Sequence, residues 1–306
     1  MKEILNAGLR VLTVMTLIAV LAGGCRQAGK KAQKDELAVD MSRDNAAIYE
    51  DLKKAEKIFY TLPSPLESAM IIKSTGAIFD EKLLNPVDNA NKYITNRSMA
   101  LNLGLYTCDL SYASLYDQTQ HIINYMNAAK KMADGLGILD AISEDDINRL
   151  EENINNREVI MEIISQTFLN SNTYLEDNGQ QAVAAMVLTG GWVEGLYIST
   201  KLVDDKNFKN NTLVERIAEQ KLSIENLLSL LRKNQGHPAI DELLLQISKI
   251  KTVFDKISVE TTPVETEYDQ NTNVTLLKSK VTSNLTPQLF GELSAIVAEI
   301  RGTFVK

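Results

Sequence analysis

The sequence has few of the residues that bind metals or form disulfides: two cysteines and two histidines among 306 residues. A structural zinc site takes four ligands, usually from closely spaced pairs of Cys or His. The sequence has no such pair, so we predict neither a metal site nor a cofactor. It also lacks a phosphate-binding glycine loop, a G-x-S-x-G elbow and a glycosidase-type carboxylate pair. An enzymatic role is therefore the less favoured hypothesis.

Acidic residues outnumber basic ones, 40 against 32, and prolines are few. The net charge of −8 argues against a nucleic-acid partner, which would select clustered Lys and Arg on one face. Six prolines occur, and none lies between Pro86 and Pro238. Because proline interrupts helices, this interval permits a long succession of them.

The apolar run Val11–Ala22 is shorter than the about 20 residues that a membrane-spanning helix needs. A weakly basic start and a small-residue end mark it as a removable signal peptide, predicted over residues 1–24. Leu21-Ala22-Gly23-Gly24-Cys25 resembles the lipobox of bacterial lipoproteins, with leucine one place earlier than usual. The resemblance implies that Cys25 carries acyl chains such as palmitate and anchors the protein to a membrane. Ordinary secretion, with Cys25 removed or free, is the alternative.

Lipidation of Cys25 would leave Cys108 without a partner for an internal disulfide, so the fold depends on its core. We predict a flexible tether over residues 25–44 and a single helical domain over residues 45–306. Ser64-Pro65-Leu66-Glu67 combines an N-cap, a proline at the first helical position and a capping-box glutamate. Asn85-Pro86 and Thr286-Pro287 repeat the pattern of a cap followed by proline.

Apolar residues recur at steps of three and four through most of this domain, which predicts amphipathic helices. The fold class we predict is all-α: a multi-helix bundle that includes a hairpin of residues 212–233 and 238–259 and a final helix over 288–303. Residues 259–285 lack helical spacing. We predict a long irregular connection there, with a short extended pair around Val264–Tyr268 and Val274–Val281 as the alternative.

Two segments, residues 98–117 and 180–202, are apolar on nearly all sides, which is typical of central helices surrounded by others. Together with two proline-containing segments, they resemble a family of helical lipoproteins from anaerobic Gram-negative bacteria with no assigned function. The similarity covers residues from about 45 onward and implies fold and anchoring, without catalytic residues. The segments that carry it are Leu62-Pro63-Ser64-Pro65, Leu84-Asn85-Pro86, Ala100-Leu101-Asn102-Leu103-Gly104, Asp109-Leu110-Ser111-Tyr112, Asp117-Gln118 and Gly190-Gly191-Trp192-Val193-Glu194-Gly195-Leu196-Tyr197.

Each central segment carries one carboxylate, Asp109 or Glu194, where an unpaired charge would cost several kcal/mol. Two interpretations are open. Both acids bond to tyrosines or helix ends and fix the register of the bundle, which is the commoner arrangement for buried polar groups. Alternatively, they belong to a ligand pocket with aromatic walls. The candidate ligand-binding residues are Tyr106, Asp109, Tyr112, Tyr116, Trp192, Glu194 and Tyr197.

The function that these observations favour is that of an envelope lipoprotein, anchored at the outer membrane or in the periplasm. It would bind a small ligand, a glycan fragment or a partner protein without catalysis. One alternative is a hydrolase or lyase that uses Asp109 and Glu194 with the neighbouring tyrosines. A second alternative is a scaffold without a pocket, which a large exposed apolar patch would favour.

Overall fold

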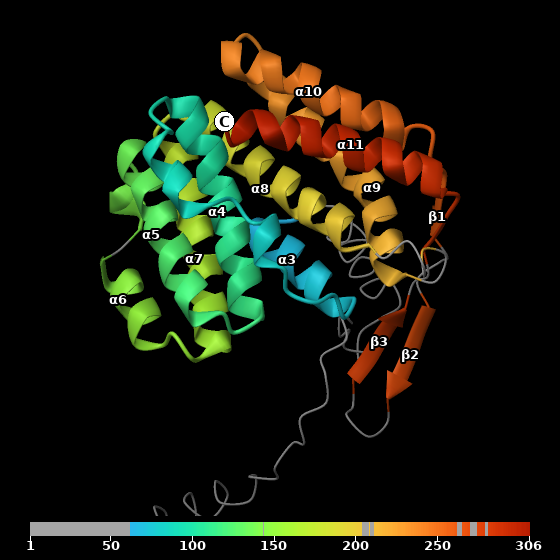
Figure 1. Ribbon diagram of the computed structural model, residues 1–306, viewed down its shortest axis with the longest axis horizontal. Helices are drawn as coiled ribbons and strands as arrows, with labels where there is room; N and C mark the ends of the chain where they lie inside the picture. Colours follow the sequence, from blue (N-terminus) through green and yellow to red (C-terminus); the bar gives the residue numbers. More distant parts are fainter. Residues whose placement is uncertain are drawn as a thin grey trace, which may run out of the picture. The chain divides into compact units, whose positions relative to one another are not determined.

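The computed structural model describes residues 62–142, 144–203, 208, 211–261, 265–269, 274–278 and 281–306, and α-helices dominate these residues (Figure 1). The predicted all-α class is confirmed. The described residues all belong to one unit, Leu37–Lys306. Predictions on residues 1–61, including the signal peptide, the Cys25 anchor and the tether, lie outside the described residues.

The α-helices are α3 (Pro65–Ser74), α4 (Asn96–Leu115), α5 (Thr119–Gly135), α6 (Glu144–Glu152), α7 (Arg157–Asp177), α8 (Gln181–Leu202), α9 (Thr212–Lys233), α10 (Pro238–Phe254) and α11 (Pro287–Phe304). In the described part of the chain, short 3₁₀ turns lie at η1 (Glu81–Leu83), η2 (Val87–Asn91) and η3 (Leu139–Ala141).

Local sequence signals place most of the helix starts. The Ser64 hydroxyl accepts the Glu67 N–H at 3.2 Å, and the Glu67 carboxylate accepts the Ser64 N–H at 2.6 Å, which completes the predicted capping box of α3. Thr286 caps α11 as predicted. The prediction for Asn85 is wrong: η2 begins after Pro86 without a side-chain cap, because the Asn85 side chain is buried and bonds elsewhere.

The two predicted central helices, α4 and α8, pack against each other at the centre of the bundle. Every α4 residue from Met99 to Leu115 is buried. Helix α8 contacts α3, α4, α7, α9 and α11, and in Figure 1 it runs between α4 and the C-terminal helices. Among the described helices, α8 is long and apolar enough to cross a membrane, but 83% of its apolar window is buried. Its hydrophobicity is therefore accounted for by protein contacts.

Glycines allow α4 and α8 to approach closely. A Cβ atom on Gly104 would lie 2.0 Å from the Val187 carbonyl oxygen, and one on Gly190 would lie 2.0 Å from the Leu101 carbonyl oxygen. Both distances are far below van der Waals contact. Any larger residue at either position would push the two helices apart.

The C-terminal part contains the predicted hairpin and the predicted final helix. Helix α10 ends at Phe254, and α9 packs against α10, which packs in turn against α11. The described parts of the connection before α11 include the extended pair that we gave as the alternative. Strand β1 (Val259–Thr261) pairs antiparallel with β4 (Val281–Ser283), and β2 (Glu265–Asp269) pairs antiparallel with β3 (Val274–Lys278), with Glu265 opposite Lys278.

Candidate functional site

The two carboxylates singled out in the sequence both lie at the interface of α4, α8 and α11. Glu194 has no exposed surface and forms a two-point ion pair with Arg301 of α11. The Arg301 Nε atom donates to Glu194 Oε2 and Nη2 donates to Oε1, each at 2.9 Å. Burial is the largest single influence on the pKa of Arg301 and lowers it, but the charge and hydrogen bonds of Glu194, with smaller contributions from Asp109 and Tyr197, together raise the pKa, so the guanidinium stays charged.

Arg301 also bonds to elements beyond its carboxylate partner. Its Nη2 atom donates to the carbonyl oxygen of Leu83 at 3.3 Å, and the guanidinium lies 4.7 Å from the centre of the Tyr197 ring. Only 11% of the Arg301 side chain is exposed. A buried ion pair with these additional contacts meets the conditions under which such a pair is tolerated in a core.

Asp109 is fully buried beside this ion pair. Its Oδ2 atom accepts the backbone N–H of Asn85 at 3.1 Å, while Oδ1 has no partner among the described residues if both acids are ionised. Burial raises the pKa of Asp109 well above its usual range, and the nearby Glu194 charge and a side-chain hydrogen bond to Glu194 raise it further. These influences favour the neutral form of the Asp109 carboxyl group.

Asparagines extend this cluster to the C-terminal end of α11. The Asn102 amide donates to the carbonyl oxygens of Ser98 at 2.9 Å and Phe304 at 2.8 Å. Its oxygen accepts from the Asn85 amide at 3.0 Å, and Asn85 also donates to the Tyr93 hydroxyl at 3.1 Å. These buried amides are therefore paired, as buried polar groups in native proteins usually are.

Two tyrosines of α4 and the tyrosine at its C-cap, Tyr116, bind the backbone of the segment that precedes the helix. Tyr106 donates to the carbonyl oxygen of Pro86 at 3.1 Å, and Tyr112 donates to that of Ile78 at 3.2 Å. The Tyr116 hydroxyl donates to the carbonyl oxygen of Ala77. Burial raises the pKa of each of these phenols, so they remain neutral donors that hold residues 77–86 against α4.

The aromatic residues of α8 lie in two different places. The Trp192 indole N–H donates to Gln220 of α9 at 3.1 Å, and Trp192 lines a small hollow of about 290 Å³ with Gly195. Tyr197 is half-buried against Arg301. The structure thus brings Asp109 and Glu194 together and places Tyr197 beside their cation, while Trp192 faces α9.

Three residues of the polar cluster were missed by the sequence reasoning: Arg301, Asn85 and Asn102. Arg301 was detectable in principle, because it is the one basic residue in α11 and two buried acids require a cation. Asn85 was misread as a helix cap. Asn102 carried no signal beyond its position in an apolar helix.

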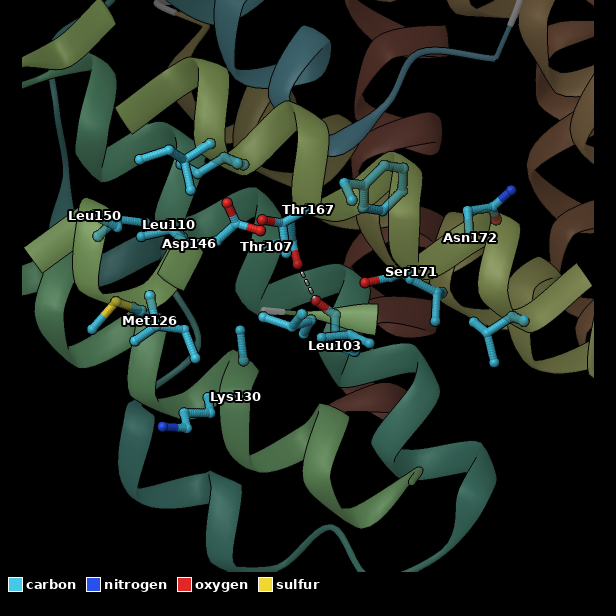
Figure 2. Close-up of a pocket in the computed structure, with 18 residues that line it drawn as sticks. Leu103, Thr107, Leu110, Met126, Lys130, Asp146, Leu150, Thr167, Ser171 and Asn172 are labelled. Atoms are coloured by element: carbon cyan, nitrogen blue, oxygen red, sulfur yellow. Dashed lines mark hydrogen bonds between the residues drawn. The ribbon is translucent and has the colours of Figure 1, made fainter. Parts of the chain in front are cut away.

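A cleft on another face of α4 was also missed. It encloses about 760 Å³, including the part open to solvent, and its walls are mostly aliphatic (Figure 2). The cleft is lined by Leu103, Thr107 and Leu110 of α4, Met126, Ala129 and Lys130 of α5, Ile142, Asp146, Ile147 and Leu150 around α6, Ile163, Ile164, Thr167, Phe168, Ser171, Asn172 and Leu175 of α7, and Val187 of α8.

Six of the lining residues are polar, and three of them, Thr107, Asn172 and Asp146, interact with other protein groups. The Thr107 hydroxyl donates to the Leu103 carbonyl oxygen at 2.7 Å, and the Asn172 amide donates to Glu176 at 3.0 Å. Asp146 lies 3.7 Å from Arg149. The walls therefore offer a ligand mainly apolar contact.

The described part of the chain contains no group of three His, Cys, Asp or Glu side chains that could hold a metal ion. Cys108 is fully buried, and burial raises the pKa of its thiol, so this sulfur is not a nucleophile at neutral pH. No family model matches the chain, and neither a curated protein nor a solved structure is similar to it.

Proposed function

We propose that the chain is a lipid-anchored protein of the cell envelope that binds an apolar ligand, without catalysis, in the cleft between α4, α5, α6 and α7. The observation that carries this proposal is the open, aliphatic cleft beside a well-packed core. Apolar surface left accessible in this way is usually kept for a ligand or partner. Of the ligand classes predicted from the sequence, a glycan fragment fits least, because sugars need many free hydrogen-bonding groups.

The contacts of the two carboxylates support binding over catalysis. A general acid or base must reach a substrate proton within about 3 Å. Glu194 and Asp109 have no exposed surface, both carboxylate oxygens of Glu194 accept from Arg301, and Asp109 accepts from Asn85. The hydrolase or lyase alternative would require the ion pair to open before any substrate could enter.

The scaffold alternative has less support from the surface. The large apolar side chains that are exposed in the described part come from separate elements rather than one patch: Met70, Ile78, Ile94, Leu169 and Leu245. Scattered residues of this kind are normal on soluble domains. The proposed membrane anchor rests on the lipobox-like sequence that ends at Cys25.

The test uses the dye ANS, which fluoresces in apolar sites, with the purified protein. Wild type should enhance its fluorescence, and Ala129→Phe, which fills the cleft, should reduce the effect by about tenfold or more. Leu169→Phe is the matched control, because Leu169 is exposed on α7 and does not line the cleft. Equal enhancement by wild type and Ala129→Phe would refute the site. In cells, Cys25→Ser should move the protein from the membrane fraction to the soluble one, and unchanged fractionation would refute the anchor.

A further inference from the structure

We propose that the ligand of this cleft is a single long acyl chain with an anionic head group, such as a free fatty acid. The chain would lie along α7 and the head would lie at Lys130. This inference rests on the proposed function, and it adds the chemical class and the orientation of the ligand.

The length of the cleft supports a long chain. Residues Ile163, Thr167, Ser171 and Leu175 line it at successive turns of α7. At about 1.5 Å per residue, this face is about 18 Å long. An acyl chain of a membrane lipid spans one leaflet, about half of the ~30 Å hydrocarbon core. This face of α7, aliphatic at Ile163 and Leu175 and hydroxyl-bearing at Thr167 and Ser171 between them, is therefore long enough for one such chain.

The chemistry of the walls supports an aliphatic chain over a polar ligand. Leu103, Leu110 and Val187 form the side contributed by α4 and α8, and Ile163 and Phe168 face it from α7. The Thr107 hydroxyl in this wall is bonded to its own helix. The chain would therefore meet mainly hydrocarbon, with the Thr167 and Ser171 hydroxyls as polar groups along α7.

Charge at the mouth of the cleft supports an anionic head. Lys130 is exposed at the edge of the lining residues, with its amine directed away from the apolar walls in Figure 2. Among the described residues, the Lys130 amine has neither an ion-pair nor a hydrogen-bond partner. The acidic wall residue, Asp146, lies on the opposite element, α6, and has Arg149 beside it. A carboxylate head is thus favoured at Lys130 and disfavoured at α6.

The test measures displacement of ANS from the protein by octanoate, laurate and palmitate. Affinity should rise about fourfold per added methylene as long as the chain fits, since each buried methylene contributes about 0.8 kcal/mol. Palmitate should bind two- to fivefold more tightly than hexadecanol. Lys130→Gln should abolish this preference for palmitate without lowering the affinity for hexadecanol. Lys131→Gln, the matched control, should leave it intact because the Lys131 amine contacts Asn91.

The outcomes separate this inference from the proposed function. If ANS binds in the cleft but affinity for the three acids does not rise with chain length, the acyl ligand is refuted and the binding function stands. Affinity could rise with chain length while hexadecanol binds as tightly as palmitate, or while Lys130→Gln still binds palmitate more tightly than hexadecanol. Either result would refute the position of the head group. If Ala129→Phe binds ANS as wild type does, the function and this inference fail together.

Discussion

Two neighbouring faces of α4 differ in how far their side chains are bonded to the rest of the protein. One face, which includes Asn102, Tyr106 and Asp109, carries polar groups that are bonded to residues far away in the chain. The adjacent face, with Leu103, Thr107 and Leu110, lines an open cleft and binds almost nothing. The polar face attracts attention in a sequence, yet its bonding capacity is used up by the fold. The face without a chemical signal is the one that leaves space for a ligand.

This difference indicates that the buried charges fix the relative positions of the helices. Glu194, Asp109 and Arg301 connect α8, α4 and α11, and Asn102 ties the last residues of α11 to the same place. Polar bonds have strict distance and angle requirements, so they fix how helices sit relative to one another. Apolar contacts, such as those that the cleft walls offer, have no such distance and angle requirements, so they suit ligands of different shapes. The predictions below test this contrast through stability.

The largest expected effect comes from removing the buried cation. Arg301→Met would leave the Glu194 carboxylate charged, buried and next to a second acid. Breaking a buried ion pair at one partner typically costs about 3–5 kcal/mol. We expect a loss of that size in the free energy of unfolding, measured by urea denaturation at neutral pH. A loss below about 1 kcal/mol would contradict a structural role for the pair.

The matched control for this variant removes both charges. Arg301→Met combined with Glu194→Gln leaves no uncompensated charge, and it should recover most of the stability lost by Arg301→Met alone. Glu194→Gln by itself should lose about 2 kcal/mol or more. A loss in the double variant equal to the sum of the two single losses would show that the residues act independently.

A smaller loss is expected where the backbones of α4 and α8 meet. Gly190→Ala would place a methyl group 2.0 Å from the Leu101 carbonyl oxygen. Overpacking of this kind costs about 1–3 kcal/mol, which thermal unfolding would detect. Gly291→Ala is the control, because a Cβ atom there meets no atom within 4 Å. Since alanine favours helix more than glycine does, this control should gain about 0.5–1 kcal/mol.

The smallest effect is a pH-dependent one at Asp109. The pKa of Asp109 is raised in the folded protein, so the folded state holds a proton that the unfolded state has lost. The resulting contribution to stability is full at acid pH and declines as pH rises from the usual aspartate range through the folded pKa. Asp109→Asn keeps an acceptor for Asn85 and a donor for Glu194 but does not titrate.

The unfolding midpoint of Asp109→Asn should therefore match that of wild type at acid pH and exceed it increasingly as pH rises. Each pH unit between the unfolded and folded pKa corresponds to about 1.4 kcal/mol. The measurement is the difference between the two midpoints across pH, which cancels the titration of other groups. A variant that is less stable than wild type at alkaline pH would mean that Asp109 is ionised in the folded state.

Much of the fold was predictable from local sequence. Helix starts follow from short-range rules, as at Ser64 and Thr286, and the central position of α4 and α8 follows from their apolar composition. Asn85 shows the limit of this reasoning. An asparagine before a proline fits a helix cap, and only the tertiary position of Asp109 and Asn102 makes it a buried hydrogen-bonding residue.

The candidate site was predictable only in part. That Asp109 and Glu194 need partners follows from the cost of burying charge, but the partner Arg301 lies 107 positions from Glu194. Pairing over such a distance is set by how α11 packs. The cleft could not be predicted. Apolar residues such as Leu110 and Ile163 have the same helical spacing in the sequence whether they pack against another helix or line an open cleft.

The position of Arg301 in the chain also bears on the order of folding. A chain is synthesised and exported from its N-terminus, so α4 and α8 are available before α11. Until α11 arrives, Glu194 lacks its counter-charge and Asn102 lacks the Phe304 carbonyl. The core therefore cannot close early, and its completion depends on contacts between distant parts of the chain, which form slowly. The final packing of the core therefore waits for the last helix of the chain.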